Sequence, residues 1–380
     1  MQEEKNKDLN PKEGQMRRGY TTGTCATAAA KAATLLALGN NLQEVSVDTP
    51  KGIPLTLGVL DCKISEKTAS CAVKKDSGDD PDITNGILIY AEVELLENEH
   101  AEIIIDGGKG VGRVTLPGLP CQIGQAAINP TPRRTIRSVV FQVLEEFGYE
   151  GGAKVTISIP QGEELAKRTY NPRLGIEGGL SVLGTSGIVE PMSEQALIDT
   201  IKVEMDVRKA LGAEYLVITP GNYGENFLKQ HFANRDFYSV KCSNFIGESL
   251  DYAEEQGFKG VLFVGHIGKL VKVAGGIMNT HSKYADARME IMSAHAARFG
   301  ADPKLIEEMI NSVTTDNAYE ALEAYSSQMR DKVIESLMNK IEFHLRSRTH
   351  QTMEIGAIMF SNKHGYLGKT SEVDEILQKI

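Results

Sequence analysis

The chain has 380 residues, 41% hydrophobic and 24% charged, which is long enough for two domains and excludes intrinsic disorder and collagen-like repeats. The net charge of −10 argues against a protein that coats nucleic acid, so we expect no nucleic-acid partner. Five scattered cysteines, a polar amino-terminal segment and the lack of any apolar run near ~20 residues argue against a disulfide framework, secretion and a membrane span, and predict a soluble cytoplasmic protein.

The first half of the chain is predicted to form an α+β domain over residues 17–175, preceded by a flexible polar tail of residues 1–16. An alanine-rich run predicts a helix over residues 24–38, and a second helix is predicted over residues 133–147. Strand patterns occupy residues 45–48, 55–60, 68–74, 87–94, 102–105 and 154–159. Because the strands outnumber the helices and do not alternate with them, we expect the α+β class.

The second half, residues 176–380, is predicted to be a Rossmann-like α/β domain with a parallel sheet. Helices are expected at residues 193–211, 225–232 and 248–256, and strands at residues 215–219, 238–242 and 260–264. This alternation is typical of parallel strands covered by helices. Residues 284–346 are expected to be mostly helical, and residues 355–360 to add a last strand. We place the domain boundary near Asn171 and Pro172, ahead of the sequence GIEGG.

Arg17, Arg18, Thr21 and Thr22 precede the alanine-rich helix. Backbone amides at a helix N-terminus, together with hydroxyl and guanidinium groups, are suited to bind an anion. The alternative is that the threonines only cap the helix while the arginines are solvated. The sequence alone leaves both interpretations open.

Residues 107–144 carry basic side chains, among them Arg133 and Arg134, and contain no Asp or Glu. Because arginine forms bidentate pairs with carboxylates, this stretch is suited to a polyanionic ligand. The alternative is an arginine-rich helix face that pairs with acidic residues elsewhere in the chain.

Residues 103–112, IIIDGGKGVG, match a glycine-rich loop that many S-adenosylmethionine enzymes place under the cofactor. However, prolines rather than a helix follow, and no carboxylate lies about 20 residues further on. A tight glycine turn is therefore favoured here.

The predicted strands of the second half end in turns rich in Gly and Asn. The residues of interest are Gly221, Asn222, Tyr223, Gly224, Asn244 and His266. Because parallel strands share one carboxyl edge, where open α/β sheets bind ligands, these turns predict a small-molecule site. Thr185 and Ser186 are further candidates for this site. The alternative is that these residues only form turns.

The acidic segment DSGDDPD, residues 76–82, is interpreted as a solvated turn because its spacing is not that of a calcium loop. His266 and His281 lie beside glycine-rich loops, where a hydrogen-bonding role is favoured over metal ligation. We expect no metal site in the protein.

Six long segments together resemble the cobalt-precorrin-5B carbon-1 methyltransferase family (CbiD). They run in order from about residue 17 to 300: RRGYTTGTCATAAAKAA, GGKGVGRVTLPGLPCQIGQAAINPTPRR, GGLSVLGTSGIVEPMS, ITPGNYGENFL, SNFIGE and GHIGKLVKVAGGIMNTHSKYADARME. The resemblance implies an enzyme of anaerobic cobalamin (vitamin B12) biosynthesis. Such an enzyme transfers a methyl group from S-adenosylmethionine to ring carbon 1 of cobalt-precorrin-5B, giving cobalt-precorrin-6A. It implies no catalytic residue set.

We therefore assign roles as hypotheses from the residues themselves. Arg17, Arg18, Thr21, Thr22, Arg133 and Arg134 are assigned to the carboxylates of the substrate. Gly221, Asn222, Tyr223, Gly224, Asn244, Thr185 and Ser186 are assigned to the methyl donor, and His266 and Glu225 to proton movement during catalysis. The implied cobalt is carried by the substrate, and transient contact with neighbouring enzymes of the pathway is expected.

Two other functions remain as alternatives. A nicotinamide-dependent oxidoreductase acting on a tetrapyrrole is compatible with the α/β half, although no strand–helix turn carries the G-x-G-x-x-G fingerprint. A corrinoid carrier without catalytic activity predicts tight product binding and no need for S-adenosylmethionine. The fold class alone excludes neither function.

Overall fold

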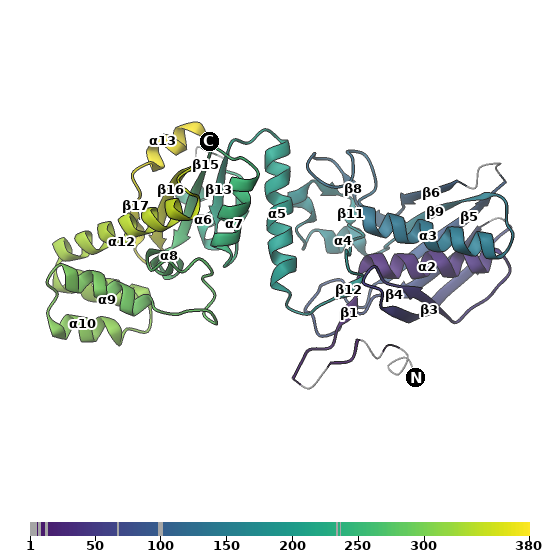
Figure 1. Ribbon diagram of the computed structural model, residues 1–380, viewed down its shortest axis with the longest axis horizontal. Helices are drawn as coiled ribbons and strands as arrows, with labels where there is room; N and C mark the ends of the chain where they lie inside the picture. Colours follow the sequence, from purple (N-terminus) through teal and green to yellow (C-terminus); the bar gives the residue numbers. More distant parts are fainter. Residues whose placement is uncertain are drawn as a thin grey trace. The chain divides into compact units, whose positions relative to one another are not determined.

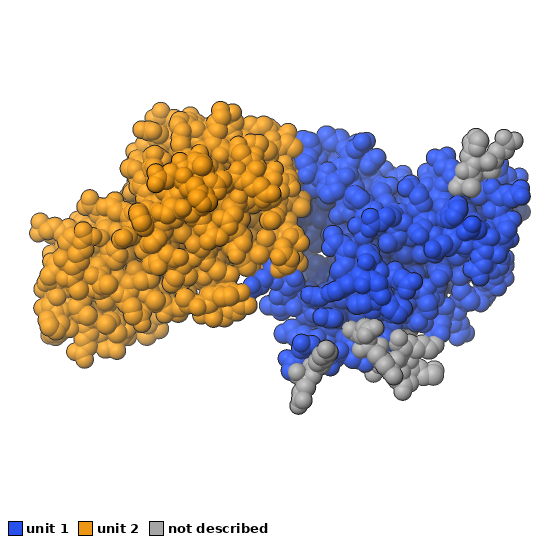
Figure 2. Space-filling model, viewed as in Figure 1, with its two compact units in different colours: residues 1–194 blue, residues 195–380 orange. Residues whose placement is uncertain are grey.

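The computed structural model describes residues 6, 9–11, 14–66, 68–97, 102–232, 235 and 237–380. The chain divides into two compact units, residues 1–194 (unit 1) and residues 195–380 (unit 2), which Figure 2 colours separately. Within the described part of the chain, no helix is both long and apolar enough to cross a membrane. The expectation of a mixed α/β chain whose second half holds a mostly parallel sheet is confirmed.

Residues 176–189, which the sequence analysis placed in the second domain, pair with strands of unit 1. The three pairs are β10 (Ile176–Glu177) with β8 (Arg113–Val114), β11 (Gly179–Leu180) with β7 (Gly110–Val111), and β12 (Ile188–Val189) with β1 (Gly19–Tyr20). The first compact unit therefore extends to Glu194. Asn171 and Pro172, where we placed the domain boundary, lie in a short 3-10 helix, Asn171–Leu174, within that unit.

Unit 1 is built on a six-stranded sheet in the order β2-β3-β4-β5-β9-β6. The strands are β2 (Glu44–Asp48), β3 (Pro54–Ile64), β4 (Thr68–Lys74), β5 (Leu88–Leu96), β6 (Ile103–Gly107) and β9 (Gly152–Ser158). All neighbours are antiparallel except β6 and β9, which are parallel. A short helix, α4 (Gly162–Ala166), follows β9.

Two helices, α2 (Thr22–Ala37) and α3 (Pro130–Glu146), lie side by side and cover this sheet (Figure 1). Six alanines of α2, from Ala26 to Ala33, are almost fully buried, because small side chains let the helix approach both β4 and β5 closely. Helix α3 begins earlier than predicted, since Pro130 occupies its first turn, where a missing N–H costs nothing.

The predicted amino-terminal tail is described only in part, and residues 1–5, 7, 8, 12 and 13 lie outside the described residues. The side-chain amide of Asn6 donates to the carbonyl of Thr56 at 3.0 Å and accepts from its N–H at 2.9 Å. Leu9 is buried in the core of unit 1. These two residues therefore contact the body of unit 1 instead of being solvated.

Unit 2 contains a five-stranded sheet in the order β14-β13-β15-β16-β17. The strands are β13 (Tyr215–Thr219), β14 (Ser239–Lys241), β15 (Gly260–His266), β16 (Glu354–Ser361) and β17 (Gly365–Lys369). The first four are parallel, and β17 is antiparallel to β16. In chain order the arrangement reads 2-1-3-4-5, so the direction of winding reverses between β13 and β15.

Helices cover both faces of this sheet, since alternate side chains of its strands enter two different apolar clusters. Phe227 and Val373 lie in the smaller cluster and belong to α6 (Asn222–His231) and α13 (Val373–Lys379). The larger cluster draws on the other helices: α5 (Glu194–Ala210), α7 (Ile246–Glu255), α8 (Ile267–Ala274), α9 (Arg288–Arg298), α10 (Pro303–Ile310), α11 (Thr315–Tyr325) and α12 (Ser327–Arg348). Helices α8 to α12 all lie in the crossover between β15 and β16 (Figure 1).

Candidate functional site

A crevice of about 400 Å³ lies at the carboxyl edge of the unit 2 sheet, where β13 and β15 end. This is the point at which the winding of the sheet reverses, and open α/β sheets bind ligands at such points. The lining residues include Pro220, Gly221, Tyr223, Gly224, Asn244, Gly265, His266, Gly268, Lys269, Lys272, Thr280, His281, Ser282, Asp286 and Arg288. Five residues expected at this edge, Gly221, Tyr223, Gly224, Asn244 and His266, therefore line one cavity.

Two glycines after β13 have different roles in the crevice. A Cβ on Gly224 would lie 2.7 Å from the carbonyl oxygen of Val264, so only glycine lets α6 pack this closely on β15. Gly221 has a φ of 140°, and nothing lies within 4 Å of where its Cβ would be. Gly221 therefore exposes backbone to the crevice, at the beginning of a helix that no side chain caps.

Lys269, on α8, connects the turns after β13 and β14. Its ammonium donates to the carbonyl of Pro220 at 2.8 Å and to the carbonyl of Ser243 at 2.9 Å. No carboxylate of the described residues lies within ion-pair distance of this ammonium. Burial lowers the pKa of Lys269, as expected for a cation without a paired anion.

Lys272, one turn further along α8, holds the loop between α8 and α9. Its side chain is 5% exposed, and its ammonium donates to the carbonyls of Ala285 at 2.8 Å and Thr280 at 3.3 Å. Asp286 lies 3.9 Å away but is already paired with Arg288, which donates two hydrogen bonds of 2.6 and 2.7 Å to it. Lys272 therefore fixes the loop against the crevice through its backbone carbonyls.

His266 ends β15 and caps α8. Its Nδ1 accepts the N–H of Gly268 at 3.1 Å, and its ring packs edge-on against Phe360. Burial lowers the pKa of His266 below its ordinary value of 6.5, against a weaker opposing effect of Asp316. At neutral pH the imidazole is therefore uncharged, with the proton on Nε2 because Nδ1 accepts a hydrogen bond.

Glu225 and Asn222, the other predicted residues of α6, contact Lys241 rather than the crevice. Both accept from the ammonium of Lys241 on β14, Glu225 at 3.0 Å and Asn222 at 2.8 Å, and neither lines the crevice. Ser239 also donates to the Glu225 carboxylate at 3.2 Å. These interactions attach the beginning of α6 to the edge strand of the sheet.

Thr185 and Ser186, the remaining residues predicted for the methyl donor, lie in unit 1. Thr185 is exposed, while the hydroxyl of Ser186 donates to the carbonyl of Ile188 and accepts its N–H. The geometry of Ser186 is that of a turn-forming serine.

In unit 1, the segment before α2 is bound by other parts of the unit. Arg17 donates two hydrogen bonds of 2.6 and 2.8 Å to Asp76, and Arg18 lies 3.7 Å from Glu190. Thr21 caps α2 by accepting the N–H of Thr24. The Thr22 hydroxyl exchanges hydrogen bonds with the backbone of Leu183. All four predicted anion-binding residues thus hold the entry of α2 in place.

The three arginines of α3 divide into one structural residue and two surface residues. Arg133 donates to the carbonyls of Ile128, Ile105 and Ala126 at 2.8–3.0 Å. Arg134 and Arg137 are exposed and line, with Arg133, a hollow of about 320 Å³ that has no acidic side chain in its lining. Of the predicted anion-binding arginines on α3, Arg134 therefore remains exposed and available to a ligand, together with Arg137.

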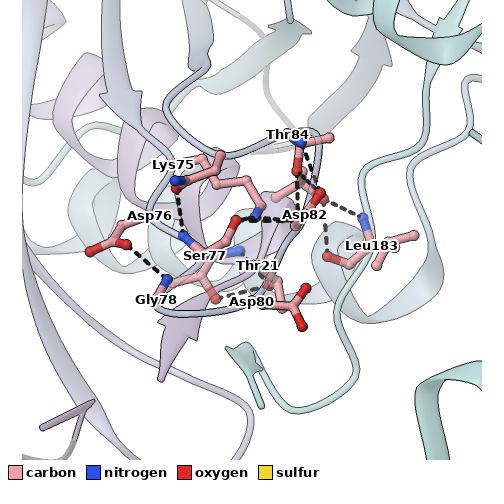
Figure 3. A network of polar contacts seen from close by, with 12 residues as sticks. Thr21, Lys75, Asp76, Ser77, Gly78, Asp80, Asp82, Thr84 and Leu183 are labelled. Carbon is pink, nitrogen blue, oxygen red and sulfur yellow. Dashed lines mark hydrogen bonds and ion pairs between the residues drawn. The ribbon is translucent and has the colours of Figure 1, made fainter. Parts of the chain in front are cut away.

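The acidic segment of residues 76–82 belongs to a partly buried polar network, which Figure 3 shows. Lys75 is 2% exposed, and its ammonium contacts the Asp82 carboxylate at 2.7 Å and the Ser77 hydroxyl at 2.5 Å. Thr84 donates both its N–H and its hydroxyl to Asp82 at 2.8 Å. Other carboxylates of this segment are bound by Arg17 and by the N–H of Met192. Within the described ranges, no three metal-ligating side chains gather.

The glycine-rich loop of residues 106–112 is closely surrounded by backbone and side chains of unit 1. A Cβ on Gly110, whose φ is 74°, would lie 1.8 Å from the carbonyl oxygen of Ile159. Asp106 forms an ion pair of 2.9 Å with Arg113. The glycines therefore allow close packing of chain segments, as expected for a tight turn.

Lys269, Lys272, Asp286 and Arg288 are crevice residues that sequence reasoning missed. The signal was present, because Ile267, Leu270, Val271 and Ala274 follow the spacing of an amphipathic helix. The glycines on either side of this segment suggested a loop, and α8 was not predicted.

Two family models and relatives that cover more than nine-tenths of the chain match this sequence. A family model described as CbiD matches residues 9–191, and a second, described as CbiD, C-terminal domain, matches residues 279–371. The cobalt-precorrin-5B C(1)-methyltransferase of Ruminiclostridium cellulolyticum is 50% identical over 92% of this chain and 90% of its own length. That of Alkaliphilus metalliredigens is 44% identical over 96% of this chain and 95% of its own. A crystal structure of the cobalamin biosynthesis protein cbiD from Archaeoglobus fulgidus is 32% identical, covering 72% of this chain and 84% of that one, with a TM-score of 0.38.

Proposed function

The chain belongs to the CbiD family, and from this premise we propose that it is a cobalt-precorrin-5B C(1)-methyltransferase of anaerobic cobalamin biosynthesis. S-adenosylmethionine supplies an electrophilic methyl group on a cationic sulfur. A carbon–carbon bond to ring carbon 1 forms as the methyl–sulfur bond breaks, and the bonding electron pair stays on sulfur. The protein's contribution is to hold the two reacting carbons about 3–3.5 Å apart and in line with sulfur.

We further propose that the methyl donor binds in the crevice of unit 2. The observation that carries this proposal is the Lys269 ammonium, a largely buried cation with two carbonyl partners and no carboxylate partner among the described residues. Buried charges are normally paired, so the carboxylate of a bound amino acid moiety would supply the missing anion. The crevice volume of about 400 Å³ lies in the range of small-molecule sites, about 300–1,000 Å³.

The other residues of the crevice are suited to bind the adenosine group of the methyl donor. Tyr223 is 63% exposed at the rim and offers an aromatic face, and the backbone at Gly221 is open to close approach. Asn244 belongs to the lining, with its side-chain oxygen accepting from Thr280. His266 presents an uncharged Nε2–H, so we assign it a hydrogen-bonding role toward the bound molecules and assign Glu225 to the support of α6.

The reaction is tested by incubating the protein anaerobically with cobalt-precorrin-5B and S-adenosylmethionine that carries a labelled methyl group. The expected product carries one labelled methyl group on ring carbon 1 and is detected by mass spectrometry. An unmodified macrocycle that stays bound to the protein would instead favour the carrier function. A change in redox state that depends on a nicotinamide would favour the oxidoreductase.

The arginines of the α3 hollow are proposed to attract the carboxylates of the substrate over a distance. Replacing Arg134 and Arg137 together with Gln is expected to lower kcat/KM for cobalt-precorrin-5B about 2- to 5-fold at low ionic strength, because exposed charges mainly change encounter rates. The difference should disappear near 1 M salt, where the Debye length falls to about 3 Å. Lys63→Gln with Arg168→Gln removes two exposed charges elsewhere in unit 1 and serves as the control. A decrease in kcat/KM that is equal at all salt concentrations would contradict this long-range electrostatic attraction of the substrate.

A further inference from the structure

The crevice of unit 2 holds more positive charge than the methyl donor can balance. Lys269, Lys272 and Arg288 line it, and Asp286 is the one carboxylate among its lining residues, which leaves an excess of two positive charges within the described residues. The donor itself carries one carboxylate, one ammonium and one sulfonium, so its net charge is also positive. Binding the donor alone would therefore increase the charge imbalance.

One of these cations, Arg288, is the first residue of α9 and keeps an unused donor. Arg288 uses Nε and Nη2 to bind Asp286, and Nη1 has no hydrogen-bond partner among the described residues. This Nη1 lies 3.9 Å from the position that a Cβ on Gly268 would occupy, at the amino-terminal turn of α8. The unpartnered nitrogen therefore lies beside the end of a helix that favours anions.

The neighbouring side chains of the loop add donors. The exposed His281 accepts the N–H of Lys283 on Nδ1 at 3.1 Å, which leaves Nε2 as a donor, and Ser282 contributes an exposed hydroxyl. Lys272 holds the backbone of this loop at Thr280 and Ala285, on either side of the residues that carry these donors. We define His281, Ser282 and Arg288 as the crevice mouth.

We propose that the crevice mouth binds a carboxylate arm of the tetrapyrrole substrate. The inference rests on the proposed function, since it requires a substrate that carries acetate and propionate side chains. A planar guanidinium with a free edge, a hydroxyl and an imidazole N–H form a donor set suited to one carboxylate. The arm supplies one of the negative charges that the crevice and the methyl donor together lack.

The first test places a charge at the mouth without disturbing the loop. Ser282→Asp adds a carboxylate at an exposed position, and Ser282→Asn is the matched neutral control. Uroporphyrin, a tetrapyrrole with acetate and propionate arms, is titrated by fluorescence, and S-adenosylmethionine by calorimetry. We expect Ser282→Asp to raise the Kd for uroporphyrin at least about 10-fold, with Ser282→Asn near wild type and the Kd for S-adenosylmethionine within about 3-fold.

The second test removes the guanidinium. Arg288→Gln is expected to raise the Kd for uroporphyrin about 10- to 100-fold, and Arg298→Gln, on the same helix but outside the crevice lining, is the control. Unchanged uroporphyrin binding in both Ser282→Asp and Arg288→Gln would overturn the inference, as would an equal loss of S-adenosylmethionine binding or no uroporphyrin binding by the wild type. A failure of the proposed function is separate: the wild type would bind uroporphyrin through the mouth but transfer no labelled methyl group.

Discussion

Replacing Asp82 with Asn is expected to lower the free energy of unfolding of unit 1 by about 3–5 kcal/mol. Asparagine keeps the shape of the side chain, but it leaves the ammonium of Lys75, which is 2% exposed, without a counter-charge. The other polar partner of that ammonium is the neutral hydroxyl of Ser77. Breaking one side of a buried ion pair costs far more than removing a surface pair.

The loss is measured by urea unfolding, with hydrogen exchange of α2 and β4 to assign it to unit 1. Glu164→Gln breaks an exposed ion pair with Lys167 in the same unit and should cost at most about 1 kcal/mol. Adding Lys75→Met to Asp82→Asn should recover much of the lost stability, because no buried charge then remains. Strictly additive losses in the double variant would contradict the ion-pair explanation.

The same pair predicts how stability depends on pH. Burial raises the pKa of Asp82, but the Lys75 ammonium and the hydrogen bonds from Thr84 outweigh it, so the net pKa lies below its ordinary value. A lowered pKa in the folded state means that the stabilisation is complete above the unfolded pKa, about 3.9, and is lost as pH falls through the folded value. Unfolding free energies measured from pH 7 to pH 2 should therefore decrease below about pH 4, with a smaller decrease for Asp82→Asn.

Replacing Lys269 with Met is expected to lower kcat/KM for S-adenosylmethionine at least about 100-fold, equivalent to about 2.7 kcal/mol. The substitution removes the charge proposed to pair with the donor carboxylate. It also leaves the carbonyls of Pro220 and Ser243 without the donor that connects their turns. Each lost charge-assisted hydrogen bond contributes about 1.5–3 kcal/mol, so the loss of two or more accounts for the expected factor.

Separate measurements distinguish binding from structural damage. The Kd for S-adenosylmethionine, measured by calorimetry, should rise with the loss of activity, while uroporphyrin binding should change much less. Lys304→Met, on the exposed surface of α10, removes a lysine of the same unit and should leave both Kd values unchanged. An affinity of Lys269→Met for S-adenosylmethionine within 3-fold of wild type would place the donor elsewhere.

Most regular elements could be predicted because their signals are local. The alanine run of α2 and the strand–turn–helix alternation from Tyr215 to His266 carry their own periodicity. Local signals do not reveal which distant strands pair. The short strands β10, β11 and β12 join unit 1 through partners far away in the chain. Pro172 and the glycines that follow it from Gly175 onward resembled a linker.

The site was predictable to the same extent. The turns at Gly221, Asn244 and His266 could be brought together because parallel strands share an edge. The partners of individual charged side chains could not be predicted. Arg133 donates to the carbonyl of Ile105, which only the fold brings near, and Arg17 pairs with Asp76, which lies far away in the sequence. An arginine in a sequence shows that a cation is present, whereas the fold decides whether that cation remains available to a ligand.

The long crossover between β15 and β16 affects the order in which the two units fold during translation. Every strand pairing of unit 1 lies within the first 194 residues, so this unit can fold on the ribosome before unit 2 is synthesised. In unit 2, β15 cannot pair with β16 until the intervening helices α8 to α12 have been translated. During that interval the edge of β15 that pairs with β16 has unpaired backbone N–H and C=O groups, and a delay in translating α9 to α12 lengthens the time in which this edge is open to pairing with other chains.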